Sequence, residues 1–145
     1  MADTITFYTN PMSRGRIARW MLEEVGQPYE TVVLGYGTTM KAPEYLAINP
    51  MGKVPAIKHG NAVVTEGAAI CAYLADVFPQ ANLAPLSNEE RARYYRWMFF
   101  AAGPIEAAAN AKAMGWEAPV EKQGMLGFGS MAHVLDALEY AVRDT

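Results

Sequence analysis

The sequence holds a single cysteine, Cys71, among its 145 residues. No intrachain disulfide can form, and without a Cys-x-x-Cys motif the chain is not expected to do dithiol redox work. Cys71 lies in an apolar helical run and is predicted to be a buried, inert thiol. The two histidines, His59 and His133, stand alone and indicate no metal site.

A strong charge of either sign is also missing. The chain has 12 basic and 15 acidic residues, which give a net charge of −3. They are interspersed and form no basic run, so nucleic acid is not an expected partner.

Long hydrophobic runs and targeting signals are absent as well. No apolar stretch approaches the length that spans a bilayer. The N-terminus lacks the basic segment followed by an apolar run that marks a signal peptide. One cysteine fits a reducing compartment. We therefore predict no membrane association and a cytoplasmic location.

The sequence does contain enough apolar residues for a sizeable core, 52% of the chain. Its first half alternates short β-branched runs with amphipathic stretches. The predicted strands are 5–8, 29–34, 54–58 and 62–65, and the predicted helices are 13–25, 41–48 and 66–78. Since a helix separates the first two strands, we expect a parallel pair joined by a right-handed crossover. This pattern predicts an α/β fold.

The composition changes at Pro79, where periodicity stops and a second proline, Pro85, follows in the same segment. Beyond this segment no strand pattern appears. Gly103-Pro104 is expected to kink a long helix, because proline removes one backbone hydrogen bond. The predicted parts are a first domain over 1–78, a linker over 79–87 and an α-helical domain over 88–145, with a loop at 124–129 and a last helix over 130–142.

Two short motifs in the first domain indicate a small-molecule site. Val54-Pro55 opens the third predicted strand after a turn formed by Asn49 to Lys53. Glu66-Gly67 begins the helix that follows the fourth strand, and a helix N-terminus offers free N–H groups to an anion. We interpret these two dipeptides as the two sides of one site.

Three stretches of the chain resemble the cytosolic glutathione S-transferase family, most of all its bacterial members. They are FYTNPMS (7–13), INPMGKVPA (48–56) and TEGAAICAYL (65–74). The resemblance implies a thioredoxin-like N-terminal domain (βαβ-ββα) followed by an all-α C-terminal domain. Members usually have several more helices, so this C-terminal domain is expected to be short and incomplete. The resemblance also implies glutathione as co-substrate with no bound cofactor, and a homodimer.

The resemblance assigns roles to the two motifs. Val54-Pro55 would have a cis peptide bond and pair with the cysteinyl backbone of glutathione as an added strand does. Glu66 and Gly67 would hold the γ-glutamyl end. Members usually carry Ser or Thr where this chain has Gly67, and the missing hydroxyl predicts binding weaker by roughly 0.5–1.5 kcal/mol. Two lysines are expected at the glycyl carboxylate: Lys41 and Lys53.

The group that activates the thiol has two candidates. Lowering a thiol pKa from about 8.5 to about 6.5 requires roughly 2.7 kcal/mol. One hydrogen bond to a charged acceptor supplies about 1.5–3 kcal/mol, so one hydroxyl suffices. We favour Ser13, at the start of the first helix, although it could be only a helix cap. Tyr8, at the end of the first strand, is the alternative unless it only packs on a neighbour. Asn10 and Arg14 are secondary donors.

These features predict an enzyme of detoxification, a transferase that joins the glutathione thiol to a small electrophile or reduces a peroxide. The alternative is a non-catalytic module that binds glutathione or a protein. Three features favour that alternative: the missing hydroxyl at Gly67, the lack of a single clear activating residue, and the short helical half.

Overall fold

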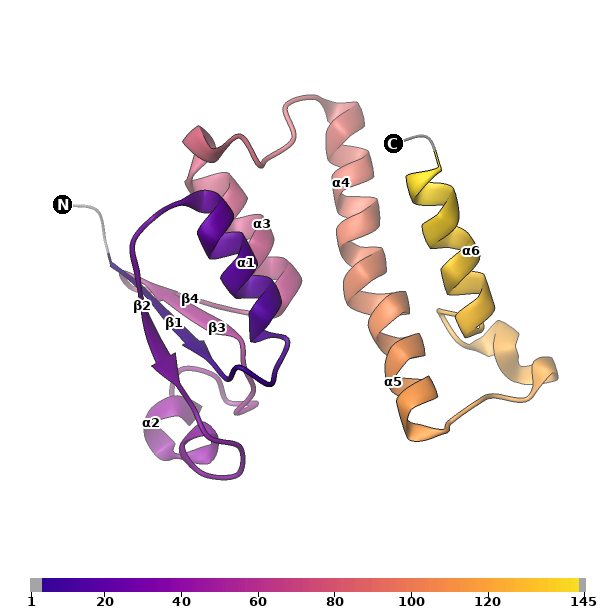
Figure 1. The fold of residues 1–145 in the computed structure, drawn as a ribbon, viewed down its shortest axis with the longest axis horizontal. Helices are drawn as coiled ribbons and strands as arrows, with labels where there is room; N and C mark the ends of the chain where they lie inside the picture. Colours follow the sequence, from indigo (N-terminus) through magenta and orange to yellow (C-terminus); the bar gives the residue numbers. More distant parts are fainter. Residues whose placement is uncertain (1–3, 144–145) are drawn as a thin grey trace. The chain divides into compact units, whose positions relative to one another are not determined.

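The computed structural model describes residues 4–143. The chain divides into two compact units between Leu86 and Ser87, and each is described separately (Figure 1). The first unit contains four strands, β1 (Ile5–Thr9), β2 (Tyr29–Val33), β3 (Ala56–His59) and β4 (Ala62–Thr65). Its helices are α1 (Gly15–Val25), α2 (Pro43–Leu46) and α3 (Gly67–Val77), with short 3-10 turns at Thr39–Lys41 and Pro79–Ala81.

The four strands form one mixed sheet in the order β2-β1-β3-β4. β1 and β2 are parallel, as predicted, and the β1–β3 and β3–β4 pairs are antiparallel. Tyr8 is paired with Ala56, and Ala56 in turn with Thr65. The ends of β1 and β4 and the start of β3 therefore meet at one edge of the sheet.

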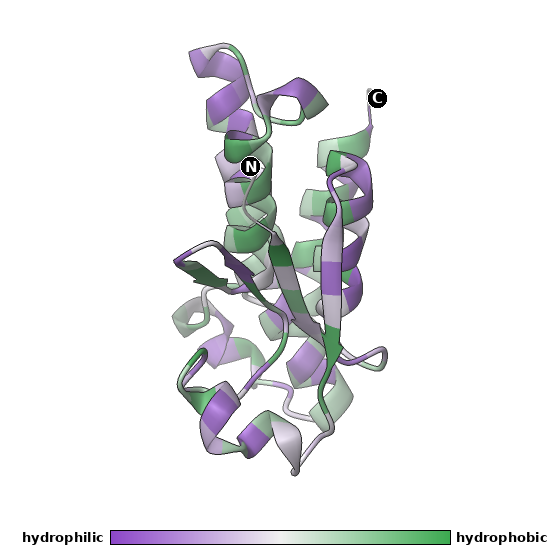
Figure 2. Ribbon diagram, turned by 90° about the vertical axis from the view of Figure 1, so that its left-hand side faces the viewer, coloured by the Kyte–Doolittle hydropathy of each residue, from purple (hydrophilic) through white to green (hydrophobic). Residues whose placement is uncertain are grey.

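The core of this unit follows from the alternation of strand residues. Ile5 and Phe7 of β1 are buried against α1 and α3, which cover one face of the sheet (Figure 1). Tyr8 points to the other face, where a smaller cluster includes Met40 and Tyr45. Figure 2 shows the corresponding change of hydropathy from residue to residue along the strands. The predicted α/β, thioredoxin-like fold of this half is confirmed.

The boundaries of α1 differ partly from the prediction. The helix begins at Gly15 and not at Ser13, because residues 10–14 form a turn first. A Cβ atom at Gly15 would lie 2.0 Å from the Thr9 hydroxyl oxygen, so only glycine allows the helix to start so close to β1. At the other end, Gly26 is the predicted left-handed cap, with φ 68°.

Prolines shift two further boundaries. The predicted helix over 41–48 is reduced to α2, since Ala42 is extended (φ −72°, ψ 149°) in front of Pro43. β3 begins at Ala56 and not at Val54, because Pro55 has no N–H to donate to a sheet.

The second unit is all helical, as predicted. It contains α4 (Asn88–Phe100), a π-helical turn (Ala101–Ile105), α5 (Glu106–Met114), a 3-10 segment (Val120–Met125) and α6 (Met131–Val142). The π-helical turn contains Pro104, where the prediction placed a kink. The 3-10 segment extends into residues that were predicted to be loop.

A capping box starts α4. The Ser87 hydroxyl accepts a hydrogen bond from the Glu90 N–H (3.1 Å), and the Glu90 carboxylate accepts one from the Ser87 N–H (2.9 Å). Ser87 ends the segment that the sequence predicted as a linker, residues 79–87. The division between the units falls just before Ser87, and the segment itself begins with a 3-10 turn.

Within residues 4–143, no helix is both long and apolar enough to cross a membrane. The same residues include no group of three or more His, Cys, Asp or Glu side chains that could hold a metal ion.

Candidate functional site

The predicted site residues gather at the sheet edge where β1, β3 and β4 come into register. The turn that follows β1 carries Asn10 and Ser13 and leads into α1. Val54 and Pro55 immediately precede β3, and Glu66 immediately follows β4. The N-termini of α1 and α3 therefore both lie at this edge, where the positive end of each helix dipole favours an anionic ligand.

The turn after β1 is held by the side chain of Asn10. Its amide Nδ2 donates to the Leu34 carbonyl (2.7 Å), and its Oδ1 accepts from the Met12 N–H (2.9 Å). The Ser13 hydroxyl donates to the Asn10 carbonyl (2.6 Å) and accepts from the Gly15 N–H (2.9 Å). Asn10, predicted to donate to a ligand, thus uses its side chain within the protein.

Ser13 and Tyr8 have different surroundings. The Tyr8 ring is half-buried and packs on the Tyr45 ring, with centroids 5.5 Å apart. It lies on the sheet face opposite α1 and α3. Ser13 is half-buried in the turn that leads into α1. Tyr8 therefore packs on a neighbouring ring, which is the structural role that the sequence suggested for it. The Ser13 hydroxyl, in contrast, lies beside the N-terminus of a helix.

The second segment is centred on Val54-Pro55, whose peptide bond is cis, as the resemblance implied. The backbone just before this bond is fixed by hydrogen bonds to the Lys53 carbonyl oxygen. That oxygen accepts hydrogen bonds from the Tyr45 hydroxyl (2.5 Å) and the Asn49 amide (2.8 Å).

Tyr45 and Asn49 were not predicted as functional residues. Asn49 is only 4% exposed, so its amide groups need partners inside the protein. Burial is the main cause that raises the pKa of Tyr45 above its ordinary value. The available signal was the Asn-Pro pair at 49–50, since asparagine often hydrogen-bonds the backbone of a turn.

The predicted lysines lie near this segment. The Lys41 ammonium donates to the Met51 carbonyl (2.9 Å), while Lys53 is exposed, as is Arg14. Gly52 has φ 54°, and a Cβ atom there would lie 2.8 Å from the Lys41 ammonium nitrogen. Glycine at 52 therefore allows both the turn and the position of Lys41.

The third segment is Glu66-Gly67 at the start of α3. Glu66 has φ 67° and ψ 120°, a backbone conformation that residues other than glycine seldom adopt. Such residues concentrate at ligand sites. α3 begins at Gly67, one residue later than the predicted start at Glu66. A Cβ atom at Gly67 would have no contact within 4 Å, so packing does not require glycine here.

Cys71 lies further along α3 and is half-buried, whereas the sequence predicted a buried thiol. Burial raises the pKa of its thiol. The thiolate is the reactive form of cysteine, so these surroundings agree with the prediction of an inert side chain.

Comparison with known proteins gives one consistent result. Residues 12–77 match the model of the glutathione S-transferase N-terminal domain. Glutathione S-transferase 1 of Zea mays is 38% identical over 90 residues, which are 61% of this chain and 42% of that protein. Elongation factor 1-gamma 3 of Oryza sativa is 31% identical over 106 residues, 73% of this chain and 23% of that protein.

Solved structures extend the likeness to both units. A glutathione transferase homologue from Sulfitobacter, crystallised with bound glutathione, has a TM-score of 0.73 and 25% identity. The alignment covers 97% of this chain and 70% of that one. The chain spans about two fifths of the Zea mays relative (42%). The likeness to the Sulfitobacter structure therefore includes the candidate site and nearly all of the second unit.

Proposed function

Because the chain belongs to the glutathione S-transferase family, we propose that it binds glutathione and activates its thiol for transfer to a small electrophile. The thiolate sulfur would form a bond to an electrophilic carbon as a leaving group such as halide departs. With a peroxide, the thiolate would attack one oxygen, the O–O bond would break, and an alcohol would leave. A second glutathione thiol would then convert the oxidised sulfur to glutathione disulfide and water. Detoxification of such compounds in the cytoplasm is part of the proposal.

One observation supports this proposal above the others. The register of Tyr8, Ala56 and Thr65 brings three segments to one edge of the sheet. The backbone of Val54 would pair with the extended cysteinyl backbone of glutathione. Glu66 offers a carboxylate for the ammonium group at the γ-glutamyl end, and the α3 N-terminus offers N–H groups to its carboxylate. Lys41 and Lys53 would attract the glycyl carboxylate.

Ser13 is the proposed activating residue, and Tyr8 is the alternative. To donate to a thiolate, the Ser13 hydroxyl would rotate away from the Asn10 carbonyl that it now contacts at 2.6 Å. A charged acceptor forms the stronger hydrogen bond, of about 1.5–3 kcal/mol. The positive end of α1 adds to the preference for thiolate. Arg14 is a further donor in the proposal.

Turnover of an activated aryl halide with glutathione tests the proposal. We expect Ser13→Ala to lower kcat/KM by about 10- to 150-fold, the equivalent of one charged hydrogen bond. Tyr8→Phe keeps the ring contact with Tyr45 and serves as the matched control, with little expected effect. An inactive Tyr8→Phe beside an active Ser13→Ala would reverse the assignment.

A non-catalytic glutathione- or protein-binding module is the second candidate. Gly67 supports it, because the residue supplies no hydroxyl to the γ-glutamyl end. The similarity to elongation factor 1-gamma 3 is compatible with it too. Retention on immobilised glutathione without turnover, unaffected by Ser13→Ala, would establish this function. A chain that does not bind glutathione would contradict the enzyme and the glutathione-binding module, and only the protein-binding form of the second candidate would stand.

A homodimer is also part of the proposal. Exposed aromatic side chains on α4, Tyr95 and Phe99, provide apolar surface of the kind found at interfaces. Light scattering of the purified chain measures its mass in solution. A monomer at all protein concentrations would contradict the dimer.

A further inference from the structure

The same three residues, Asn-Pro-Met, occur at two places around the site, at 10–12 and at 49–51. In each turn the asparagine Oδ1 accepts a hydrogen bond from the methionine N–H two residues later, at 2.9 Å in the first turn and 3.1 Å in the second. In each turn the asparagine amide also donates to a backbone carbonyl, 24 residues away for Asn10 and four residues away for Asn49. The two turns are thus built alike.

The carbonyls that the two asparagines bind belong to different parts of the site. Asn10 binds Leu34, just after β2, at 2.7 Å, and so fixes the turn that carries Ser13. Asn49 binds Lys53 at 2.8 Å and so fixes the peptide before Val54. Asn10 therefore holds the turn that carries the Ser13 hydroxyl, and Asn49 holds the backbone that leads into Val54.

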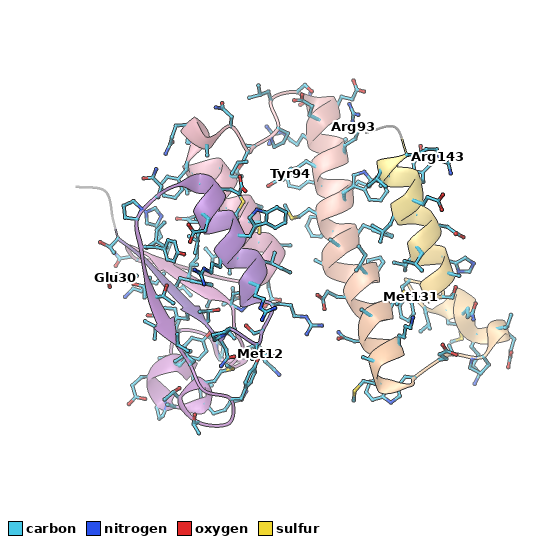
Figure 3. The ribbon with its side chains drawn as sticks, viewed as in Figure 1. Met12, Glu30, Arg93, Tyr94, Met131 and Arg143 are labelled. Atoms are coloured by element: carbon cyan, nitrogen blue, oxygen red, sulfur yellow. The ribbon has the colours of Figure 1, made fainter. Side chains whose placement is uncertain are left out.

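A second side chain reinforces each turn by donating to the methionine carbonyl. The Tyr36 hydroxyl donates to Met12 at 3.3 Å, and the Lys41 ammonium donates to Met51 at 2.9 Å. The methionine side chains themselves are 79% and 67% exposed. Figure 3 labels Met12 at the turn before α1.

We propose that Asn10 and Asn49 are two positioning residues with separate roles at the site. Asn10 sets the orientation of the Ser13 hydroxyl and so controls the activation of the thiol. Asn49, together with Tyr45, sets the backbone at Val54 and so controls the affinity for glutathione. This inference rests on the proposed function, and it replaces the predicted role of Asn10 as a direct donor to the ligand.

The experiment compares Asn10→Ala and Asn49→Ala in the full chain. Asn10→Ala is expected to lower kcat about tenfold, to raise the thiol pKa read from the pH profile of kcat, and to leave KM for glutathione within about twofold. Asn49→Ala is expected to raise KM for glutathione about tenfold with kcat retained.

Further variants separate positioning from folding. Since Asn49 is buried, Tyr45→Phe provides a milder loss at the same Lys53 carbonyl and should also raise KM alone. Met12→Ala and Met51→Ala are the matched controls, because they keep both backbone hydrogen bonds and remove only exposed side chains. We expect both controls to remain within about twofold of the unsubstituted chain.

The outcomes divide cleanly. If the Asn10 and Asn49 variants change the same constant, or if each activity falls only with the folded fraction seen in thermal melts, the proposed division is wrong. If the unsubstituted chain binds glutathione without turnover, the enzymatic proposal fails on its own. Calorimetric affinity and the ultraviolet absorbance of the bound thiolate then replace KM and kcat, with the same expected separation. A chain that does not bind glutathione overturns both proposals.

Discussion

The two units of this chain use their apolar residues differently. In the first unit a four-stranded sheet and two covering helices bury large side chains, among them Phe7, Ile57 and Leu74. In the second unit, the buried apolar residues of the described part are Ala108 and Val134. Larger side chains there are half-buried or exposed: Trp97 and Phe100 are half-buried, and Phe99 is 69% exposed.

This difference in burial matters for the candidate site, which lies in the first unit. The sheet fixes the register of three strands, and the register fixes the places of Val54 and Glu66. A densely packed core transmits small changes of volume, so the site should be sensitive to the core of the first unit. The second unit contributes no residue to the proposed glutathione contacts.

The largest expected effect is a loss of stability from Phe7→Ala. Phe7 is 1% exposed, and truncation of a buried phenylalanine costs about 3–5 kcal/mol. The matched change in the second unit, Val134→Ala, should cost about 2 kcal/mol. Urea unfolding followed by circular dichroism measures both. Equal costs would contradict the contrast between the two cores.

A smaller effect is expected from Ser87→Ala at the start of α4. The substitution removes the hydroxyl of the capping box, which typically costs about 0.5–2 kcal/mol. Stability should fall while calorimetric affinity for glutathione stays the same, because the cap belongs to the second unit. Ser87→Thr keeps a capping oxygen and should retain most of the stability. A marked loss of affinity in Ser87→Ala would show that the units are coupled at the site.

A gain of similar size is expected from Gly67→Ser in the first unit. The position has room for a side chain, and serine would restore the hydroxyl usual in the family. Affinity for glutathione should rise by roughly 0.5–1.5 kcal/mol. Gly67→Ala is the control that adds the Cβ atom without the hydroxyl. Equal affinity in the two variants would mean that the hydroxyl makes no contact.

The smallest expected effect concerns the chemistry of Cys71. Because burial raises the thiol pKa, the thiolate fraction at neutral pH is below that of an exposed cysteine. Alkylation by iodoacetamide should be slow near neutral pH, accelerate as the pH rises through the raised pKa, and become fast on unfolding. Mass spectrometry follows the reaction. Rapid alkylation of the folded chain at neutral pH would refute the assignment.

Local patterns were enough to predict most of the fold. The β-rich run at β1, the amphipathic stretch of α1 and the second run at β2 predicted a parallel pair, and the structure contains it. Boundaries were predicted less well wherever a close contact or a proline decided them. α1 begins late because Gly15 approaches Thr9, a contact between residues that no periodicity marks.

The candidate site was predicted in part. Val54-Pro55 and Glu66-Gly67 were chosen by their motifs, and the structure brings both to the same edge as Ser13. Asn49 binds a carbonyl only four residues away, and the Asn-Pro pair was a local signal for it. The role of Asn10 could not be predicted, because it depends on a carbonyl that only the fold brings within reach. For Asn10 that carbonyl is Leu34, 24 residues away in the sequence.

The sequence by itself determined the types of the elements, the family resemblance and the side chains available at the site. These follow from periodicity, from proline and glycine, and from short motifs, all of which act over a few residues. Only the tertiary structure decided that Ser13, Val54 and Glu66 share one edge, and that Asn10 is occupied within the protein. Strand register and hydrogen bonds join residues distant in sequence, and their partners are fixed only when the core packs.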